Sequence, residues 1–500
     1  MASFRRRALA LVPALATALV AAGCAVGPDY REPKLALDGS FVNAAPRAGG
    51  SGANAANADI AAFWRGFGDA DLTALIDRAL AANGDIRIAQ ARLQESRATL
   101  QGTRAELLPN VGVAADAGRV LTPEYLLPGA SRSQRTTGFY DAGFTASWEL
   151  DFFGRNRRAS ESAAAQVDAS QAGVHAAQTI VAAEIARNYL ELRGLQQRLA
   201  VARDSIVNQR ETLRLTRARL DVGRGTRLDV ARAQSLLDST EASLPVLQVA
   251  ADRSAYRIAT LAAASLRDVA TQLATPRLLP TLPVTDLSAL PLGTPEQLLR
   301  RRPDLVQSER LLAAATANIG VATADLFPRV SLTGLIGFAS GRLTSLGDGN
   351  SQQYSLGAGL TWPLLDFGRV RSRIAASEAQ ALQALAGYEQ TVATALEETE
   401  GALSQFSHSA EQTDKLASAA RNADDAARLS KLRFDAGAVD FLIVLDAERQ
   451  SLAARDALVL SQVGQATALV SIYRALGGGW SVPVSAAVAG ASPGAAPSQW

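Results

Sequence analysis

The stretch W-E-L-D-F-F-G-R at residues 148–155 recurs as W-P-L-L-D-F-G-R at residues 362–369, 214 positions further along the chain. Five of the eight positions of this octapeptide are identical. The same offset relates R-L-D-V-G at 219–223 to R-F-D-A-G at 433–437, and no gap is needed between the two matches. A match at a constant offset over this length indicates a tandem duplication.

Another pair of matching segments lies upstream of the octapeptides. A-E-L-L-P-N-V at 105–111 matches A-D-L-F-P-R-V at 324–330 at an offset of 219, so the first copy has five extra residues between its proline and its tryptophan. We therefore expect a first repeat at 61–275 and a second at 276–480. The gapless match downstream predicts that the helices after the octapeptide are equally long in both copies.

Before each octapeptide, apolar side chains alternate with small or polar ones, at residues 140–148 and 354–362. The segments after the two matched prolines alternate in the same way. This period of two predicts one β-hairpin in each repeat, at about 109–150 and about 328–366. Strands of about ten residues suit a tilted membrane crossing. A half-buried hairpin in a soluble sheet fits the periodicity equally well.

Helical patterns fill the rest of each repeat. We expect helices at about 70–107, 155–222 and 227–264 in the first copy, and at about 295–326, 369–436 and 441–476 in the second. A helix of roughly 68 residues extends about 100 Å. Apolar residues recur every seven positions in the first long helix, which predicts a narrow packing seam. These are Ile185, Leu192, Leu199, Ile206, Leu213 and Leu220.

The N-terminus has the pattern of a secreted protein. Residues 1–23 place three arginines before a short apolar run, which is typical of a signal peptide. L-V-A-A-G-C at 19–24 resembles a bacterial lipoprotein cleavage box, which would make Cys24 the lipidated N-terminus. An ordinary signal peptide with an incidental cysteine is the alternative. We expect residues 24–60 to be extended and the tail at 481–500 to be disordered.

The composition excludes several classes of function. The formal net charge of +2 gives no reason to expect a nucleic-acid partner. With two histidines and one cysteine, neither a His/Cys metal site nor a Cys-His nucleophile pair is expected. No acid–base or nucleophile constellation recurs, so we expect no enzyme, no catalytic residue, no metal and no cofactor.

Several further phrases accompany the octapeptides. They are G-C-A-V-G-P-D-Y at 23–30, F-W-R-G-F-G-D-A-D-L at 63–72, R-R-P-D-L at 301–305, L-F-P-R-V-S-L at 326–332 and Y-R-A-L-G-G-G-W at 473–480. With these phrases the chain resembles the TolC-like outer-membrane lipoproteins of tripartite resistance-nodulation-division efflux pumps, in the branch called the NodT family.

The resemblance implies a fold and an assembly. The fold would be mainly α with a membrane β-barrel, in which each repeat supplies one hairpin and long coiled helices. A homotrimer would form a twelve-stranded β-barrel in the outer membrane and an α-helical barrel in the periplasm. The partners would be a periplasmic adaptor (membrane fusion) protein and an inner-membrane pump of the resistance-nodulation-division type. The protein would be lipid-anchored in the outer membrane of a bacterial cell.

The resemblance also implies a passive duct that exports small molecules, with an iris-like gate at its periplasmic end. The gate residues would be Leu442 and Asp446, which form a hydrophobic ring and an acidic ring. The residues implied for the helix tips and for adaptor docking are Gly223, Thr226, Arg227, Asp229, Gly437 and Asp440. The residues implied for the joints where strand becomes helix are Trp148, Gly154, Trp362 and Gly368.

Two other functions remain open at this stage. One is the outer-membrane duct of a type I protein secretion system. The other is a periplasmic coiled-coil scaffold with no pore. The repeat partner of Asp446 is Arg232, so the two tips differ in charge, and we expect the second tip to line the pore more closely than the first.

Overall fold

The computed structural model describes residues 25–43, 61–284 and 294–480, together with positions 287, 290 and 292. The predicted signal peptide, the lipidation of Cys24 and the predicted disordered tail concern residues outside these ranges. Among the residues that are described, none of the helices is both long enough and apolar enough to cross a membrane.

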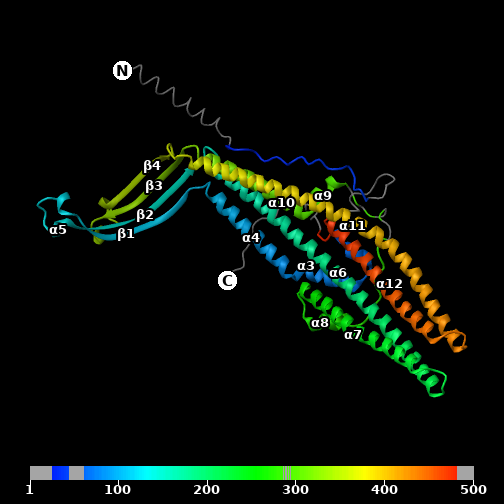
Figure 1. Cartoon of the computed structure of the whole chain (residues 1–500). Helices are drawn as coiled ribbons and strands as arrows, with labels where there is room; N and C mark the ends of the chain where they lie inside the picture. Colours follow the sequence, from blue (N-terminus) through cyan, green and yellow to red (C-terminus); the bar gives the residue numbers. More distant parts are fainter. Residues whose placement is uncertain are drawn as a thin grey trace. The chain divides into compact units, whose positions relative to one another are not determined.

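The two repeats share six elements in the same order (Figure 1). The first contains α3 (Ala70–Ala82), α4 (Gly84–Ala105), β1 (Asn110–Leu121), β2 (Thr136–Leu150), α6 (Arg155–Asp221) and α7 (Arg227–Leu261). The second contains α9 (Pro295–Arg301), α10 (Pro303–Ala324), β3 (Arg329–Ser340), β4 (Gln352–Thr361), α11 (Arg369–Asp435) and α12 (Phe441–Ala475). A short α5 (Arg132–Arg135) lies between β1 and β2, and α8 (Leu266–Leu273) follows α7.

The prediction of equally long helices is confirmed. Both α6 and α11 have 67 residues, and both α7 and α12 have 35. The predicted hairpins are also present, and together they form one antiparallel sheet in the order β1-β2-β3-β4. Three of the five extra residues of the first copy lie in the connection between β1 and β2, which contains α5, and the other two lengthen the start of β2. The central β2–β3 pair joins the two repeats, and β1 and β4 are the edge strands.

The sheet has one apolar and one polar face. Val113, Phe144, Ile336 and Tyr354 lie opposite one another across the four strands, and all four are more than half exposed. The neighbouring row on the other face is Gly112, Thr145, Leu335 and Ser355, in which leucine is the only large apolar residue. An exposed row of large apolar side chains is unusual in a soluble protein and marks contact with another apolar surface.

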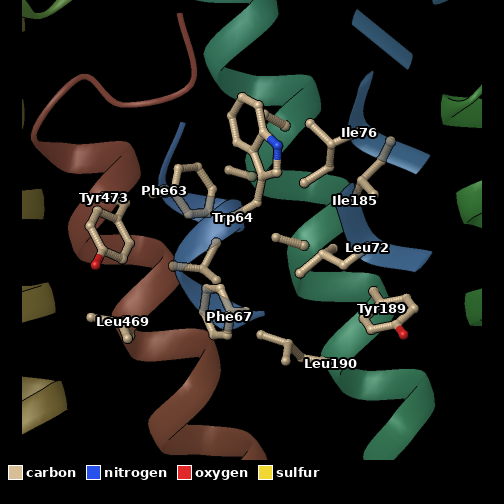
Figure 2. Packing of buried hydrophobic residues seen from close by; sticks show 14 of the residues in the cluster. Phe63, Trp64, Phe67, Leu72, Ile76, Ile185, Tyr189, Leu190, Leu469 and Tyr473 are labelled. Atoms are coloured by element: carbon tan, nitrogen blue, oxygen red, sulfur yellow. The ribbon is translucent and has the colours of Figure 1, made fainter. Parts of the chain in front are cut away.

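The chain forms two compact units, and both repeats contribute to each of them. The first unit takes described residues 25–35, 89–173 and 304–392, and it contains the sheet. The second takes the remaining described residues and contains the largest apolar core. In that core Phe63 stacks on Tyr473 of α12, with ring centroids 4.9 Å apart, and Trp64 packs edge-on against Phe63 (Figure 2).

Five of the six residues of the predicted heptad seam of α6 are buried, and the sixth, Leu220 beside the tip, is partly exposed. Ile185, Leu192, Leu199, Ile206 and Leu213 are each at most 5% exposed. Polar residues three positions after the seam residues, such as Asn188 and Gln209, are also buried. The buried surface of α6 is therefore wider than the single heptad seam. The helices expected at about 70–107 and 295–326 are each divided in two, since Asn83 separates α3 from α4 and Arg302 separates α9 from α10.

Candidate functional site

The two tryptophans of the octapeptides make the same contact in both repeats. The indole Nε1–H of Trp148 donates to the carbonyl oxygen of Leu107, and that of Trp362 donates to the carbonyl oxygen of Leu326, both at 3.0 Å. These carbonyls lie just beyond the C-terminal ends of α4 and α10, where backbone acceptors lack helical partners. Each tryptophan therefore attaches the second strand of its hairpin to the end of the preceding helix.

The glycines of the octapeptides supply the turn from strand to helix. Gly154 has a φ of +78° and Gly368 a φ of +89°, a backbone conformation that L side chains rarely adopt. The long helices begin at the next residue.

An aspartate caps each long helix from one of two adjacent positions in the octapeptide. The carboxylate of Asp151 accepts from the backbone N–H of Arg157 at 2.9 Å. The carboxylate of Asp366 accepts from Gly368 N–H at 3.1 Å and Val370 N–H at 2.6 Å. The two aspartates thus have the same capping role although they occupy different positions of the octapeptide. A comparison of the identical positions alone does not reveal this shared role.

Arg158 has a role that the sequence did not predict. An arginine in the first turn of a helix is usually solvated, yet the side chain of Arg158 is only 6% exposed. Its guanidinium donates to the carbonyl oxygens of Ala25, Val26 and Gly27 and pairs with Asp29 at 2.7 Å.

The segment that Arg158 binds lies against the first joint. The backbone N–H of Val26 donates to the carbonyl oxygen of Phe153 at 3.1 Å. A Cβ built on Gly154 would lie 2.5 Å from the Cβ of Ala25. The first described residues of the chain are thus fixed beside the end of β2.

The first helix tip is a tightly bonded turn between α6 and α7. Gly223 has a φ of +74°, and its N–H donates to the carbonyl oxygen of Leu220. Thr226 and Asp229 form a capping box, in which the threonine hydroxyl accepts from Asp229 N–H and the Asp229 carboxylate accepts from Thr226 N–H. The Asp229 carboxylate is thus occupied within the tip, whereas Arg227 is exposed.

The second tip has the same left-handed glycine conformation as the first, but the helix that follows it is capped differently. Gly437 again has a φ of +74°, and Asp440 is the N-cap residue of α12. The side chain of Asp440 makes no capping hydrogen bond. The tips contact each other where the Arg219 guanidinium lies 3.8 Å from the centre of the Phe434 ring and donates to the Phe434 carbonyl oxygen.

The predicted gate residues lie on the exposed face of α12. Leu442 is 53% exposed, whereas Phe441, Val444 and Leu445 pack against α6 and α7 in a separate apolar core. Asp446 lies one turn after Leu442, on the same face. The Asp446 carboxylate is not isolated, because it accepts from Arg449 at 2.7 Å and from Gln450 at 2.6 Å.

A buried polar contact lies behind this face. The carboxylate of Glu448 accepts from the hydroxyl of Thr212 on α6 at 2.8 Å, and its other oxygen is buried with no hydrogen-bond partner among the described residues. Burial raises the pKa of Glu448, although the Thr212 hydrogen bond and the positive charge of Lys431 act in the opposite direction. The described part of the chain contains no group of three or more His, Cys, Asp or Glu side chains that could hold a metal ion.

Comparison with known proteins finds relatives that match nearly the whole length of the chain. A family described as outer membrane efflux protein matches residues 75–264 and 294–478, which is one match in each predicted repeat. Outer membrane protein OprJ of Pseudomonas aeruginosa is 32% identical over 94% of this chain and 96% of its own length. Nodulation protein T of Rhizobium leguminosarum bv. viciae is 31% identical over 97% of this chain and 95% of its own length.

A solved structure has the same fold. The outer-membrane channel OprN is 39% identical to this chain and aligns with a TM-score of 0.83, over 91% of this chain and 100% of that one.

Proposed function

The chain belongs to the outer membrane efflux protein family, and from this premise we propose that it is the outer-membrane channel of a tripartite efflux system. Three copies form a passive duct through which small toxic compounds leave the cell. The duct carries out no catalysis and needs no cofactor. Energy comes from an inner-membrane pump of the resistance-nodulation-division type, which a periplasmic adaptor connects to the channel.

The row of exposed apolar side chains on one face of the sheet is the observation that supports this proposal best. Val113, Phe144, Ile336 and Tyr354 are 58–86% exposed in the single chain. Lipid tails would cover such a face, and the small and polar side chains of the other face would line the water-filled path.

We place the gate at the second tip, with Leu442 and Asp446 facing the axis of the duct. The partly exposed positions of both side chains support this role, because each can meet its copies from the other protomers. The ion pair with Arg449 offsets part of the negative charge of Asp446. We therefore expect removal of the Arg449 guanidinium to increase the preference of the channel for cations.

We assign adaptor docking to the exposed turns of both tips. The backbone at Gly223 and Gly437 is open, since a Cβ built on either would meet nothing within 4 Å. Arg227 and Asp440 offer the adaptor one positive and one negative side chain. Thr226 and Asp229 stabilise the first turn through the capping box and thus contribute to docking by holding its shape.

We propose that Cys24 is lipidated and that the anchor reaches the outer membrane at the level of the first joint. The support is the position of its neighbour Ala25, which Arg158 holds against Gly154 at the end of β2. The lipid and the strand end would then enter the membrane at the same height. The Trp148 and Trp362 indoles would lie at that interface, which tryptophan favours.

Drug accumulation in cells tests the proposed function. A bacterial strain that lacks this gene should accumulate a fluorescent efflux substrate several-fold above the parent strain, and the wild-type gene should restore the parental level. Normal accumulation without the gene, in a strain with no second outer-membrane channel, would show that the protein does not serve efflux.

A further inference from the structure

We infer that the outer end of the sheet binds a phosphate group of a phosphorylated glycolipid in the outer leaflet of the membrane, with Arg119 and Arg342 as its ligands. The outer end is the end at which the β1–β2 and β3–β4 connections lie, and the inner end is the end at the two joints. This inference rests on the proposed function, because it takes the sheet to cross the outer membrane. It adds a lipid-binding site, which passage through the duct does not itself require.

Arg119 is the only charged residue on the apolar face of the four described strands. The strand register places the odd-numbered residues of β1 on this face, together with the even-numbered residues of β2, β3 and β4. The other charged residues of the strands lie on the polar face, and these are Asp116, Asp141, Glu149 and Arg329. A charge on a lipid-facing surface is costly in the middle of the bilayer and nearly neutral at its interfaces. Arg119 should therefore lie at an interface.

The duplication indicates the level at which Arg119 lies. The repeat partner of Arg119 is Phe338, at the offset of 219, and that of Tyr140 is Tyr354, at the offset of 214. In the order Arg119, Tyr140, Phe338, Tyr354, these residues lie on successive strands. Each is two residues nearer the inner end than the strand partner of the one before it. Since repeat partners lie at equal levels in a duplicated sheet, this diagonal runs parallel to the membrane, as tilted strands require.

The diagonal has the composition of an interfacial girdle. Three of its four side chains are aromatic, and membrane strands place aromatic rings at the interfaces. The first repeat thus has an arginine at the level where the second has a phenylalanine. Arg119 is exposed, and from this level its long side chain can reach the lipid head groups.

Arg342 lies close to Arg119 in the fold. Gly138 is the strand partner of Arg119, and the carbonyl oxygen of Gly341 would lie 3.0 Å from a Cβ built on Gly138. The β3–β4 connection therefore begins beside Gly138, and Arg342 is its second residue. Both arginines are exposed. Neither guanidinium makes a hydrogen bond or an ion pair with any other residue that the structure describes.

The remaining charges at this end of the sheet favour an anion. Residues 117–138 and 338–352 contain four arginines and two acidic residues. One of these arginines is occupied within the protein, since Arg135 pairs with Glu124 at 3.6 Å and donates to two backbone carbonyl oxygens. This leaves Arg119, Arg132 and Arg342 against the single carboxylate of Asp348. The outer end therefore carries a net positive charge.

An amphiphile with a phosphate head group fits these residues. A guanidinium binds phosphate through two parallel hydrogen bonds, and basic residues beside membrane-crossing segments are typical sites for lipid head groups. The acyl chains would lie on exposed apolar side chains nearer the inner end, such as Val113 and Phe144. The outer leaflet of a bacterial outer membrane consists mainly of lipopolysaccharide, whose lipid A part carries phosphates. We therefore assign the site to lipid A.

Native mass spectrometry of the purified protein in detergent, with added bisphosphorylated lipid A, tests this site. The wild-type protein should bind the lipid, and Arg119→Phe should weaken binding by roughly tenfold, because a charge-assisted contact is lost. Phenylalanine is the residue that the second repeat has at this level, so the variant keeps the girdle intact. The mass of the protein in the same spectrum shows whether the variant assembles like the wild type.

Two further variants make the test specific. Arg342→Gln changes a residue outside the strands and should weaken binding several-fold. Arg371→Gln removes an exposed arginine next to the second joint, at the inner end, and should leave binding unchanged. If Arg119→Phe and Arg342→Gln both bound lipid A within twofold of the wild type, the site would be wrong.

The choice of probe identifies the ligand. Lipid A without phosphates should bind weakly, and equally to the wild type and to Arg119→Phe. Displacement of lipid A by millimolar inorganic phosphate would indicate a site for free phosphate. Phosphatidylglycerol that bound as tightly as lipid A would indicate a site for any anionic lipid. Either result would overturn the assignment to lipid A.

Drug accumulation separates this inference from the proposed function. If Arg119→Phe bound lipid A like the wild type, in a protein that does lower drug accumulation, the lipid site alone would be wrong. If lipid A binding depended on Arg119, in a protein whose loss left accumulation unchanged, the efflux function alone would be wrong.

Discussion

Replacing Arg158 with alanine should release the N-terminal segment from the first joint. The guanidinium makes hydrogen bonds to three consecutive carbonyl oxygens and ion pairs with Asp29 and Glu161. The segment from Ala25 to Asp29 is held by the Arg158 bonds to Ala25, Val26, Gly27 and Asp29 and by the Val26–Phe153 backbone bond, and it also packs closely on Gly320 of α10. The change therefore acts on local opening of this segment and leaves the sheet and its strand pairing in place.

The size of the effect follows from the bonds that are lost. Hydrogen bonds to a charged group contribute about 1.5–3 kcal/mol each, and bonds that share one donor group are not additive. Two of the three carbonyl contacts are long, at 3.3 and 3.5 Å, so we take the total as about 2–4 kcal/mol. A loss of that size lowers hydrogen-exchange protection by roughly 30-fold to 1000-fold.

Hydrogen exchange measured by mass spectrometry on peptides that contain Val26 reads this out directly. The matched control is Arg371→Ala, which removes an exposed arginine from the first turn of α11. It should leave the exchange of the N-terminal peptide unchanged. If Arg158→Ala left the protection of Val26 within threefold of the wild type, the guanidinium would not be what holds the segment, and the reasoning about the anchor would fail.

Three further predictions concern the joints and the tips. Trp148→Phe and Trp362→Phe should each lower the free energy of unfolding by about 0.5–1.5 kcal/mol, as measured by thermal unfolding. The two losses should add in the double variant, and a marked departure from additivity would mean that the joints are coupled. Thr226→Ala should remove about 1 kcal/mol of capping stability and so speed proteolysis of the first tip. Asp440→Ala should speed proteolysis of the second tip less, because the Asp440 side chain makes no capping hydrogen bond. Equal effects of the two variants would contradict the role of the capping box. Because the folded-state pKa of Glu448 is raised, its contribution to tip stability is complete below the ordinary carboxyl pKa and is lost as the pH rises through the raised value. Hydrogen-exchange protection at the tip, expressed relative to the intrinsic exchange rate at each pH, should therefore be higher at pH 4 than at pH 7, and Glu448→Gln should flatten this difference.

Much of this fold could be predicted from repetition and periodicity. The offset of 214 residues predicted the equal lengths of α6 and α11, and the period of two located both hairpins. A repeat offset and an alternation of apolar and polar residues are both properties of the order of residues along the chain. A single sequence is therefore enough to find them.

Contacts between distant segments could not be predicted in the same way. Nothing in the local pattern distinguishes the buried Arg158 from an ordinary solvated arginine, because its partners in the N-terminal segment lie more than a hundred residues earlier in the chain. The Arg449 partner of Asp446 is close in sequence, one turn further along the same helix, and spacing alone could have indicated it. The resemblance implies a role for Asp446 only and none for Arg449.

Single-channel conductance across a planar lipid bilayer tests the central claim most directly. The wild-type protein should insert as a channel of small conductance that prefers cations. Leu442→Ala with Asp446→Ala should increase the conductance several-fold and weaken the cation preference, whereas the repeat partners, Leu228→Ala with Arg232→Ala, should change either property much less. A protein that forms no channel would contradict the duct. Channels whose conductance and selectivity were the same in the wild type and the Leu442/Asp446 variant would contradict the gate.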